Sequence, residues 1–228
     1  MSNKTGTQTR REEEIAFLAI ENILDVDIYL ADSGGGNSRP DGEWRDPAND
    51  FLNILEVTSP DETELMRNMF IAARDGKNHI ESGFLGSDWG MLHENINEML
   101  SEGWVVKNVE KLRMAKADRR HLYLYGRGMK YRDWFNRLCR WEPDFQDEPL
   151  LPVDIPKGID RIWFQAGSAQ KEPGAEFTTW VAWYDPDSGW GYKSIVIDER
   201  FLPSPRPNLR GGFLNIKRVP KNRISIDN

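Results

Sequence analysis

The sequence predicts a single α/β domain in which a mixed β-sheet is flanked by helices. Segments with helical and strand-like periodicity follow one another in the order α-β-β-α-α-β-α-β-β, a pattern typical of layered α/β proteins. Hydrophobic residues make up 39% and charged residues 29% of the 228 residues, which is a globular composition. No apolar run approaches the roughly 18 residues that cross a bilayer, so we expect no membrane association.

The first half of the chain has the clearest start and stop signals. Thr9 and Glu12 form a capping box ahead of a one-sided apolar pattern. Ser59 and Pro60 mark a second helix start, directly after the most apolar strand. The expected elements are helices at 9–24, 59–76 and 89–103, strands at 26–30 and 51–58, a glycine-rich loop at 33–38 and a turn at 39–42.

The second half alternates between basic helical segments and aromatic strands. We expect helical segments at 107–117 and 129–140 and a proline-containing loop at 144–158. The expected strands lie at 121–125, 161–165, 177–184 and 194–197. The domain boundaries that follow are a disordered tail at 1–8, the α/β domain at 9–200 and a proline-rich basic extension at 201–228.

The composition also bounds the compartment and the cofactors. The beginning of the chain has no apolar stretch typical of a secretory signal, so we expect a cytoplasmic protein. Cys139 is the single cysteine, which excludes an intramolecular disulfide, and we expect it to be buried and inert. The three histidines, His79, His93 and His121, lack the close spacing of a zinc site. We expect His121 to be a hydrogen-bonded structural residue.

The net charge of −7 conceals two basic stretches, 103–140 and 200–223. They could bind a polyanion, or they could neutralise acidic surfaces of the same fold, and the sequence leaves both open. In the first stretch cations alternate with aromatic residues such as Trp104, Tyr131 and Trp134, a combination that holds single-stranded nucleic acids. The nucleic-acid-binding candidates are Lys107, Arg113, Lys116, Arg119 and Arg120.

Two acidic residues in the first half suggest chemistry. Asp41 lies in a turn, and Glu56 lies near the end of the strand that follows. If these segments pair, both carboxylates meet at one edge of the sheet. Oxygen ligands of this kind suit Mg²⁺, which can stabilise charge on a phosphoryl group and lower the pKa of a bound water. The alternatives are that Asp41 bonds its own turn backbone and that Glu56 pairs with an arginine.

Pro40-Asp41 followed by Glu56-Val57-Thr58 resembles the PD-(D/E)xK motif of the restriction-endonuclease-like superfamily. Segments 120–123, 151–163 and 183–190 are similar to uncharacterised bacterial proteins that carry the same Glu-Val-Thr strand. The resemblance implies a restriction-endonuclease-like fold and a Mg²⁺-dependent nuclease, with a role in bacterial defence against foreign DNA. It also implies that Asp41 and Glu56 bind the metal, and it places an additional helical acid among residues 12–14.

The chain departs from that motif at Thr58, which stands where the catalytic lysine belongs. A neutral hydroxyl cannot supply positive charge, so a lysine from elsewhere has to do so. The candidates are Lys77, Lys107 and Lys111, and Lys111 is the one we favour. The alternative is a nuclease fold that has lost cleavage and binds nucleic acid or a protein partner. A third hypothesis is an inhibitor whose acidic surface mimics nucleic acid.

Overall fold

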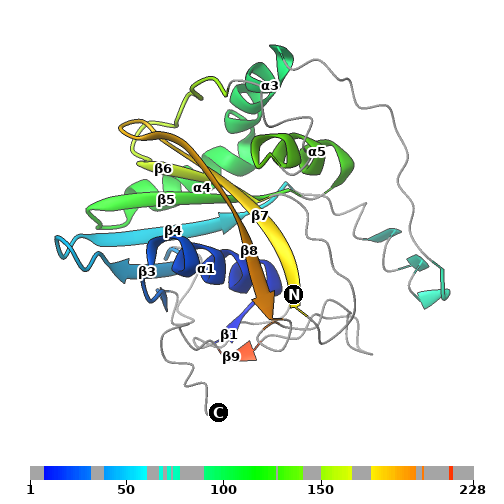
Figure 1. Cartoon of the computed structure of the whole chain (residues 1–228), viewed down its shortest axis with the longest axis horizontal. Coiled ribbons are helices and arrows are strands. Elements are labelled where there is room, and N and C mark those ends of the chain that lie inside the picture. Colours follow the sequence, from blue (N-terminus) through cyan, green and yellow to red (C-terminus); the bar gives the residue numbers. More distant parts are fainter. Residues whose placement is uncertain are drawn as a thin grey trace.

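The computed structural model describes residues 8–31, 39–60, 67–68, 71–72, 74–77, 90–126, 128–140, 150–165, 176–198, 202 and 216–217. A seven-stranded mixed sheet with the strand order β2-β3-β4-β5-β6-β7-β8 dominates the fold (Figure 1). Its strands are β2 (Tyr29–Leu30), β3 (Gly42–Arg45), β4 (Leu52–Thr58), β5 (Arg119–Tyr125), β6 (Arg161–Gln165), β7 (Glu176–Asp185) and β8 (Gly189–Asp198). The described helices include α1 (Arg11–Leu24), α3 (Gly90–Leu100), α4 (Gly103–Met114) and α5 (Gly128–Leu138). The expected α/β class with a mixed sheet is thereby confirmed.

The centre of the sheet is parallel and its flanks are antiparallel. β4, β5 and β6 run in the same direction, whereas β3 pairs antiparallel with β4 and β7 pairs antiparallel with β6. Parallel neighbours require crossover connections, and helices α3 and α4 lie between β4 and β5 in the chain, with α5 between β5 and β6. The carboxyl ends of three central strands therefore meet at one edge.

Helices cover both faces of this sheet, and each face has its own apolar core (Figure 1). Because side chains alternate along a strand, Leu55, Tyr123 and Trp163 pack with α1 on one face. Ile54 and Leu122, one position away, pack with α3, α4 and α5 on the other. The described helices α1, α3, α4 and α5 thus form two layers around the sheet.

Four elements differ locally from the sequence-based expectation. The cap of α1 is Arg10 rather than Thr9, and its backbone N–H donates to Glu13 Oε2 at 2.9 Å. Gly103 was expected to end a helix, but it begins α4, which follows the end of α3 after two residues. Strand β3 was concealed by the preceding turn signal, and β8 is longer than expected at both ends because it pairs along all of β7.

The terminal segments meet in a separate two-stranded pairing. β1 (Gln8–Thr9) pairs antiparallel with β9 (Ile216–Lys217), so part of the expected C-terminal extension lies beside the beginning of the domain. The expected disordered tail at 1–8 is wrong at Gln8, which belongs to β1 because it pairs with β9. Residues 1–7, the glycine-rich loop at 33–38, half of the helix expected at 59–76 and His79 lie outside the described residues. Within the described parts of the chain, no helix has the length and hydropathy needed to cross a membrane.

Candidate active site

Glu56 lies on the face of β4 that α4 covers. Ile54 belongs to the core on that face, and Glu56, two residues along the strand, faces the same way. The residue is 5% exposed. A carboxylate this deeply buried needs compensation, because desolvation penalises its charge.

Lys111 on α4 supplies this compensation. Its Nζ donates a hydrogen bond to Glu56 Oε1 at 2.8 Å and lies 2.7 Å from Oε2. Lys111 is the favoured one of the three candidate lysines, and it is the one that reaches Glu56. Lys107 is exposed on the same helix, and Lys77 is exposed as well. The partner that α4 supplies to Glu56 is thus a lysine.

Asn108 fixes the rotation of α4 that brings Lys111 to Glu56. Asn108 lies one turn before Lys111 on the helix. The Nδ2 of Asn108 donates to Thr58 Oγ1 at 2.8 Å and to the Trp104 carbonyl oxygen at 2.7 Å. Thr58 therefore holds the helix against the end of β4, while the positive charge comes from the helix itself. Sequence analysis did not single out Asn108, although its spacing from Lys111 places both on one helical face.

Asp41 lies at the same point of the sheet, immediately before β3. The register pairs Gly42 with Leu55, which places Asp41 beside Glu56 on the neighbouring strand. The Asp41 N–H donates to the Leu55 carbonyl oxygen at 2.9 Å, and the Val57 N–H donates to Asp41 Oδ2 at 2.9 Å. The carboxylate thus contacts the backbone directly after Glu56. Asp41 is 7% exposed.

The pair of carboxylates fits the donor set that Mg²⁺ uses in proteins. Mg²⁺ is held by one or two carboxylates and keeps several waters, so two acids on adjacent strands suffice. Among the described residues, no group of three or more histidine, cysteine, aspartate or glutamate side chains is placed to hold a metal. Asp41 and Glu56 are the residues that would hold the ion.

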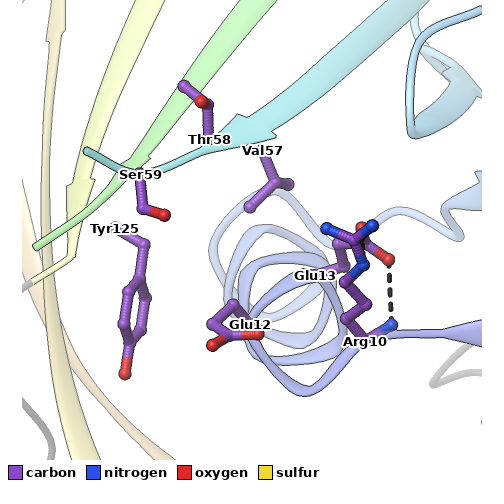
Figure 2. A pocket seen from close by; sticks show the side chains of 7 residues that line it. All are labelled: Arg10, Glu12, Glu13, Val57, Thr58, Ser59 and Tyr125. Carbon is purple, nitrogen blue, oxygen red and sulfur yellow. Dashed lines mark hydrogen bonds and ion pairs between the residues drawn. The ribbon is translucent and has the colours of Figure 1, made fainter. Parts of the chain in front are cut away.

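A polar pocket of about 190 Å³ opens at the carboxyl ends of β4 and β5, on the side of α1 (Figure 2). Thr58 and Tyr125 contribute to it from β4 and β5, and Ser59 follows β4 directly. Figure 2 shows Glu12 between Tyr125 and the hydrogen-bonded pair Arg10 and Glu13. Residues at which the resemblance implies a helical acid therefore line a cavity next to the last residues of β4. The full lining is Arg10, Glu12, Glu13, Val57, Thr58, Ser59 and Tyr125.

The five predicted nucleic-acid-binding cations extend from α4 to the start of β5. Lys107, Arg113 and Lys116 are exposed. The guanidinium of Arg119 lies 5.9 Å from the Phe51 ring centroid. Arg120 donates from Nε to the Leu112 carbonyl oxygen and from Nη2 to that of Ala115, both at 3.0 Å, so it caps the end of α4. Nucleic-acid contacts by all five cations remain a prediction.

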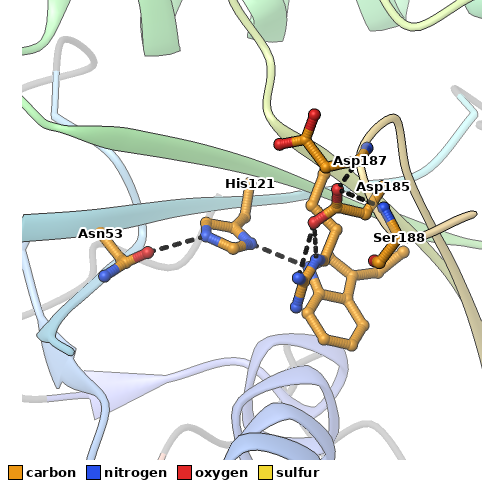
Figure 3. Close-up of polar contacts among 7 residues, drawn as sticks. Asn53, His121, Asp185, Asp187 and Ser188 are labelled. Carbon is orange, nitrogen blue, oxygen red and sulfur yellow. Dashed lines mark hydrogen bonds and ion pairs between the residues drawn. The ribbon is translucent and has the colours of Figure 1, made fainter. Parts of the chain in front are cut away.

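A buried polar network lies on the face of the sheet that α1 covers (Figure 3). The sequence predicted a hydrogen-bonded His121 but not its partners. His121 Nε2 lies 3.0 Å from Asn53 Oδ1, and the Trp163 indole N–H donates to His121 Nδ1 at 3.2 Å. Because an indole N–H only donates, Nδ1 is the acceptor and Nε2 carries the proton. Burial lowers the pKa of His121 to about 3, and the charges of Arg161 and Arg119 add to the effect. The expectation of a structural histidine agrees with this geometry.

An ion pair stands beside that network (Figure 3). Arg161 Nη2 lies 2.7 Å from Asp185 Oδ2, and the Asp187 N–H donates to Asp185 Oδ1 at 2.9 Å. Burial alone would raise the pKa of Asp185, but these bonds outweigh it and hold the pKa below its ordinary value. The role of the pair is to tie β6 to the turn between β7 and β8. Cys139 is buried, and its Sγ lies 3.3 Å from the Phe164 carbonyl oxygen, as expected of an inert thiol.

Neither the protein-family models nor the curated proteins match this chain.

Proposed function

We propose that the protein is a Mg²⁺-dependent nuclease-like enzyme that hydrolyses phosphodiester bonds in DNA or RNA, built on a restriction-endonuclease-like fold. The observation that supports the proposal most strongly is the contact between Lys111 Nζ and both oxygens of Glu56, at 2.8 and 2.7 Å. This lysine brings a positive charge to the carboxylate pair that Thr58 cannot provide. The site thereby contains the residue types of the motif, with the lysine coming from α4.

Each side chain of the site has a definite task in this proposal. Asp41 and Glu56 hold the metal, which when bound polarises the phosphate and lowers the pKa of a coordinated water. Lys111 places a fixed ammonium where negative charge develops on the phosphoryl oxygens and the attacking oxygen. The Val57 N–H orients the Asp41 carboxylate. The hydrogen bond from Asn108 to Thr58 holds α4 so that Lys111 stays next to β4.

The proposal is tested by cleavage of end-labelled DNA and RNA oligonucleotides with Mg²⁺ or Mn²⁺. We expect cleavage that EDTA abolishes and that Asp41→Asn and Glu56→Gln each reduce by at least about a hundredfold. Glu43→Gln, a partly buried acid two residues from Asp41, is the matched control and should retain activity. Absence of cleavage of every substrate by the wild-type protein, or full activity in Glu56→Gln, would overturn the proposal.

A second candidate is a binding module of the same fold without catalysis. It is favoured by one feature of the site: Asp41 Oδ2 accepts a backbone N–H, and both oxygens of Glu56 face Lys111. The two acids are thus compensated by the protein's own groups. This candidate predicts binding of nucleic acid or a protein partner with no cleavage and no change on adding divalent cations. Binding that weakens steeply with salt would indicate phosphate contacts, and salt-insensitive binding would indicate a protein partner.

A further inference from the structure

Three partly buried aromatic rings gather where α4 begins and α5 passes. Trp104 lies 6.2 Å from Tyr131, and Tyr131 lies 5.6 Å from Trp134, measured between ring centroids. Successive rings are nearly perpendicular, at 81° and 82°. We call Trp104, Tyr131 and Trp134 the aromatic cluster.

Polar bonds at the ring edges hold part of this cluster in place. The Trp104 indole N–H donates to Glu102 Oε2 at 2.6 Å, and the Tyr131 hydroxyl lies 3.1 Å from Oε1 of the same carboxylate. Both donors are satisfied, and the charge of Glu102 is engaged by them. Trp104 and Tyr131 are therefore fixed in orientation and do not need to reorganise before a base stacks on them.

A cation accompanies the cluster. The ammonium of the exposed Lys130 lies 5.1 Å from the Tyr131 ring centroid and 4.6 Å from that of Trp134. Lys107 is exposed one turn from Trp104 on α4. The three rings pack against the apolar core and remain partly exposed, and aromatic rings bordered by exposed cations match a chain of bases joined by phosphates.

The aromatic cluster and the candidate active site share helix α4. Trp104, Asn108 and Lys111 are four and three residues apart, so they share one helical face. Seven residues of α-helix rise about 10 Å, which is the length of about three stacked nucleotides. A strand whose phosphate lies at Lys111 therefore has bases within reach of Trp104.

We propose that the aromatic cluster binds bases adjacent to the cleaved phosphate, so that the substrate is single-stranded rather than duplex nucleic acid. The inference rests on the proposed function for the position of the phosphate. In a duplex the bases are stacked inside the helix and can reach a protein ring only by being flipped out, which costs the free energy of unstacking and unpairing. In a single strand the same bases stack on Trp104 without that cost.

The test measures binding in EDTA, so that cleavage is not needed, using fluorescence anisotropy of a labelled single strand and of the same strand in a duplex. We expect tighter binding of the single strand. Trp104→Ala should weaken it about 5- to 150-fold, the range measured for losing one stacked base, whereas Trp104→Phe should retain most of it. Lys130→Met should lower the salt dependence by about one phosphate contact.

Matched controls lie on β8, at the far edge of the sheet. Tyr192 is 54% exposed and has its own cation, Arg140, 5.6 Å from its ring centroid. Tyr192→Ala and Lys193→Met should leave single-strand binding unchanged. Equal binding of duplex and single strand, or equal effects of Trp104→Ala and Tyr192→Ala, would overturn the inference. Trp104-dependent binding without any metal-dependent cleavage would uphold the base-binding role and overturn the proposed nuclease, so the two failures are distinguishable.

Discussion

Replacement of Lys111 by methionine is the change whose consequence the site defines most sharply. In the ion pair with Glu56, the lysine side chain is 19% exposed and the glutamate side chain is 6% exposed. Removing one partner of a buried pair costs about 3–5 kcal/mol, because the remaining charge loses its compensation. Since Lys111 keeps contact with water, we expect the free energy of unfolding to fall by about 2–3 kcal/mol. For a chain of this length that lowers Tm by about 4–12 °C.

The assay is urea unfolding of wild type, Lys111→Met, Glu56→Gln and the double variant. Lys107→Met, an exposed lysine on the same helix, is the control and should change the free energy of unfolding by less than about 0.5 kcal/mol. The double variant should be more stable than the sum of the single effects predicts, because each partner is costly only when the other is left behind. Mg²⁺ should raise the Tm of Lys111→Met more than that of wild type, since a cation can replace the ammonium beside Glu56. Strict additivity, or a Lys111→Met variant as stable as Lys107→Met, would refute this account of the pair.

Two further predictions concern the frame of the site. Gly42→Ala should destabilise the protein by about 1–3 kcal/mol and reduce cleavage. The reason is that an added Cβ would lie 2.9 Å from both Ile28 Cγ2 and Phe17 Cε1, next to Asp41. Unchanged Tm and activity would contradict this prediction. Acid should also destabilise the fold, since the pKa of His121 is about 3 when folded and 6.5 when unfolded. Between these two pH values, the unfolded chain binds a proton on His121 that the folded chain does not bind. The free energy of unfolding therefore has its full value above about pH 6.5 and declines by up to about 1.4 kcal/mol per pH unit below it. Chemical unfolding between about pH 7.5 and 5 should show a loss of about 2 kcal/mol, and His121→Gln should remove most of that slope; a flat profile for wild type is the contrary outcome.

The sequence was sufficient for the elements whose periodicity is strong and local. Strands β4 and β6 and helix α3 have the expected positions, because their apolar patterns agree with both propensity and burial. Strand β3 was missed because its four residues follow a turn signal and gain their strand conformation only by pairing with β4.

The site was predictable in its residue types and unpredictable in its geometry. Asp41 and Glu56 could be selected from their spacing, but their proximity depends on the register of β3 against β4. Lys111 and Glu56 are 55 residues apart, and which lysine of α4 reaches the carboxylate depends on the rotation of the helix that Asn108 fixes. The partners of His121 likewise come from β4 and β6, and no local pattern marks them.

The central claim is that Asp41 and Glu56 together hold one divalent cation. Mn²⁺ binds carboxylate sites much as Mg²⁺ does, and it can be followed directly by electron paramagnetic resonance during a titration. The account predicts one bound Mn²⁺ per wild-type chain, with the affinity reduced at least about tenfold in both Asp41→Asn and Glu56→Gln and unchanged in Glu43→Gln. A wild-type protein that binds no Mn²⁺, or variants that bind it as tightly as wild type, would contradict the claim.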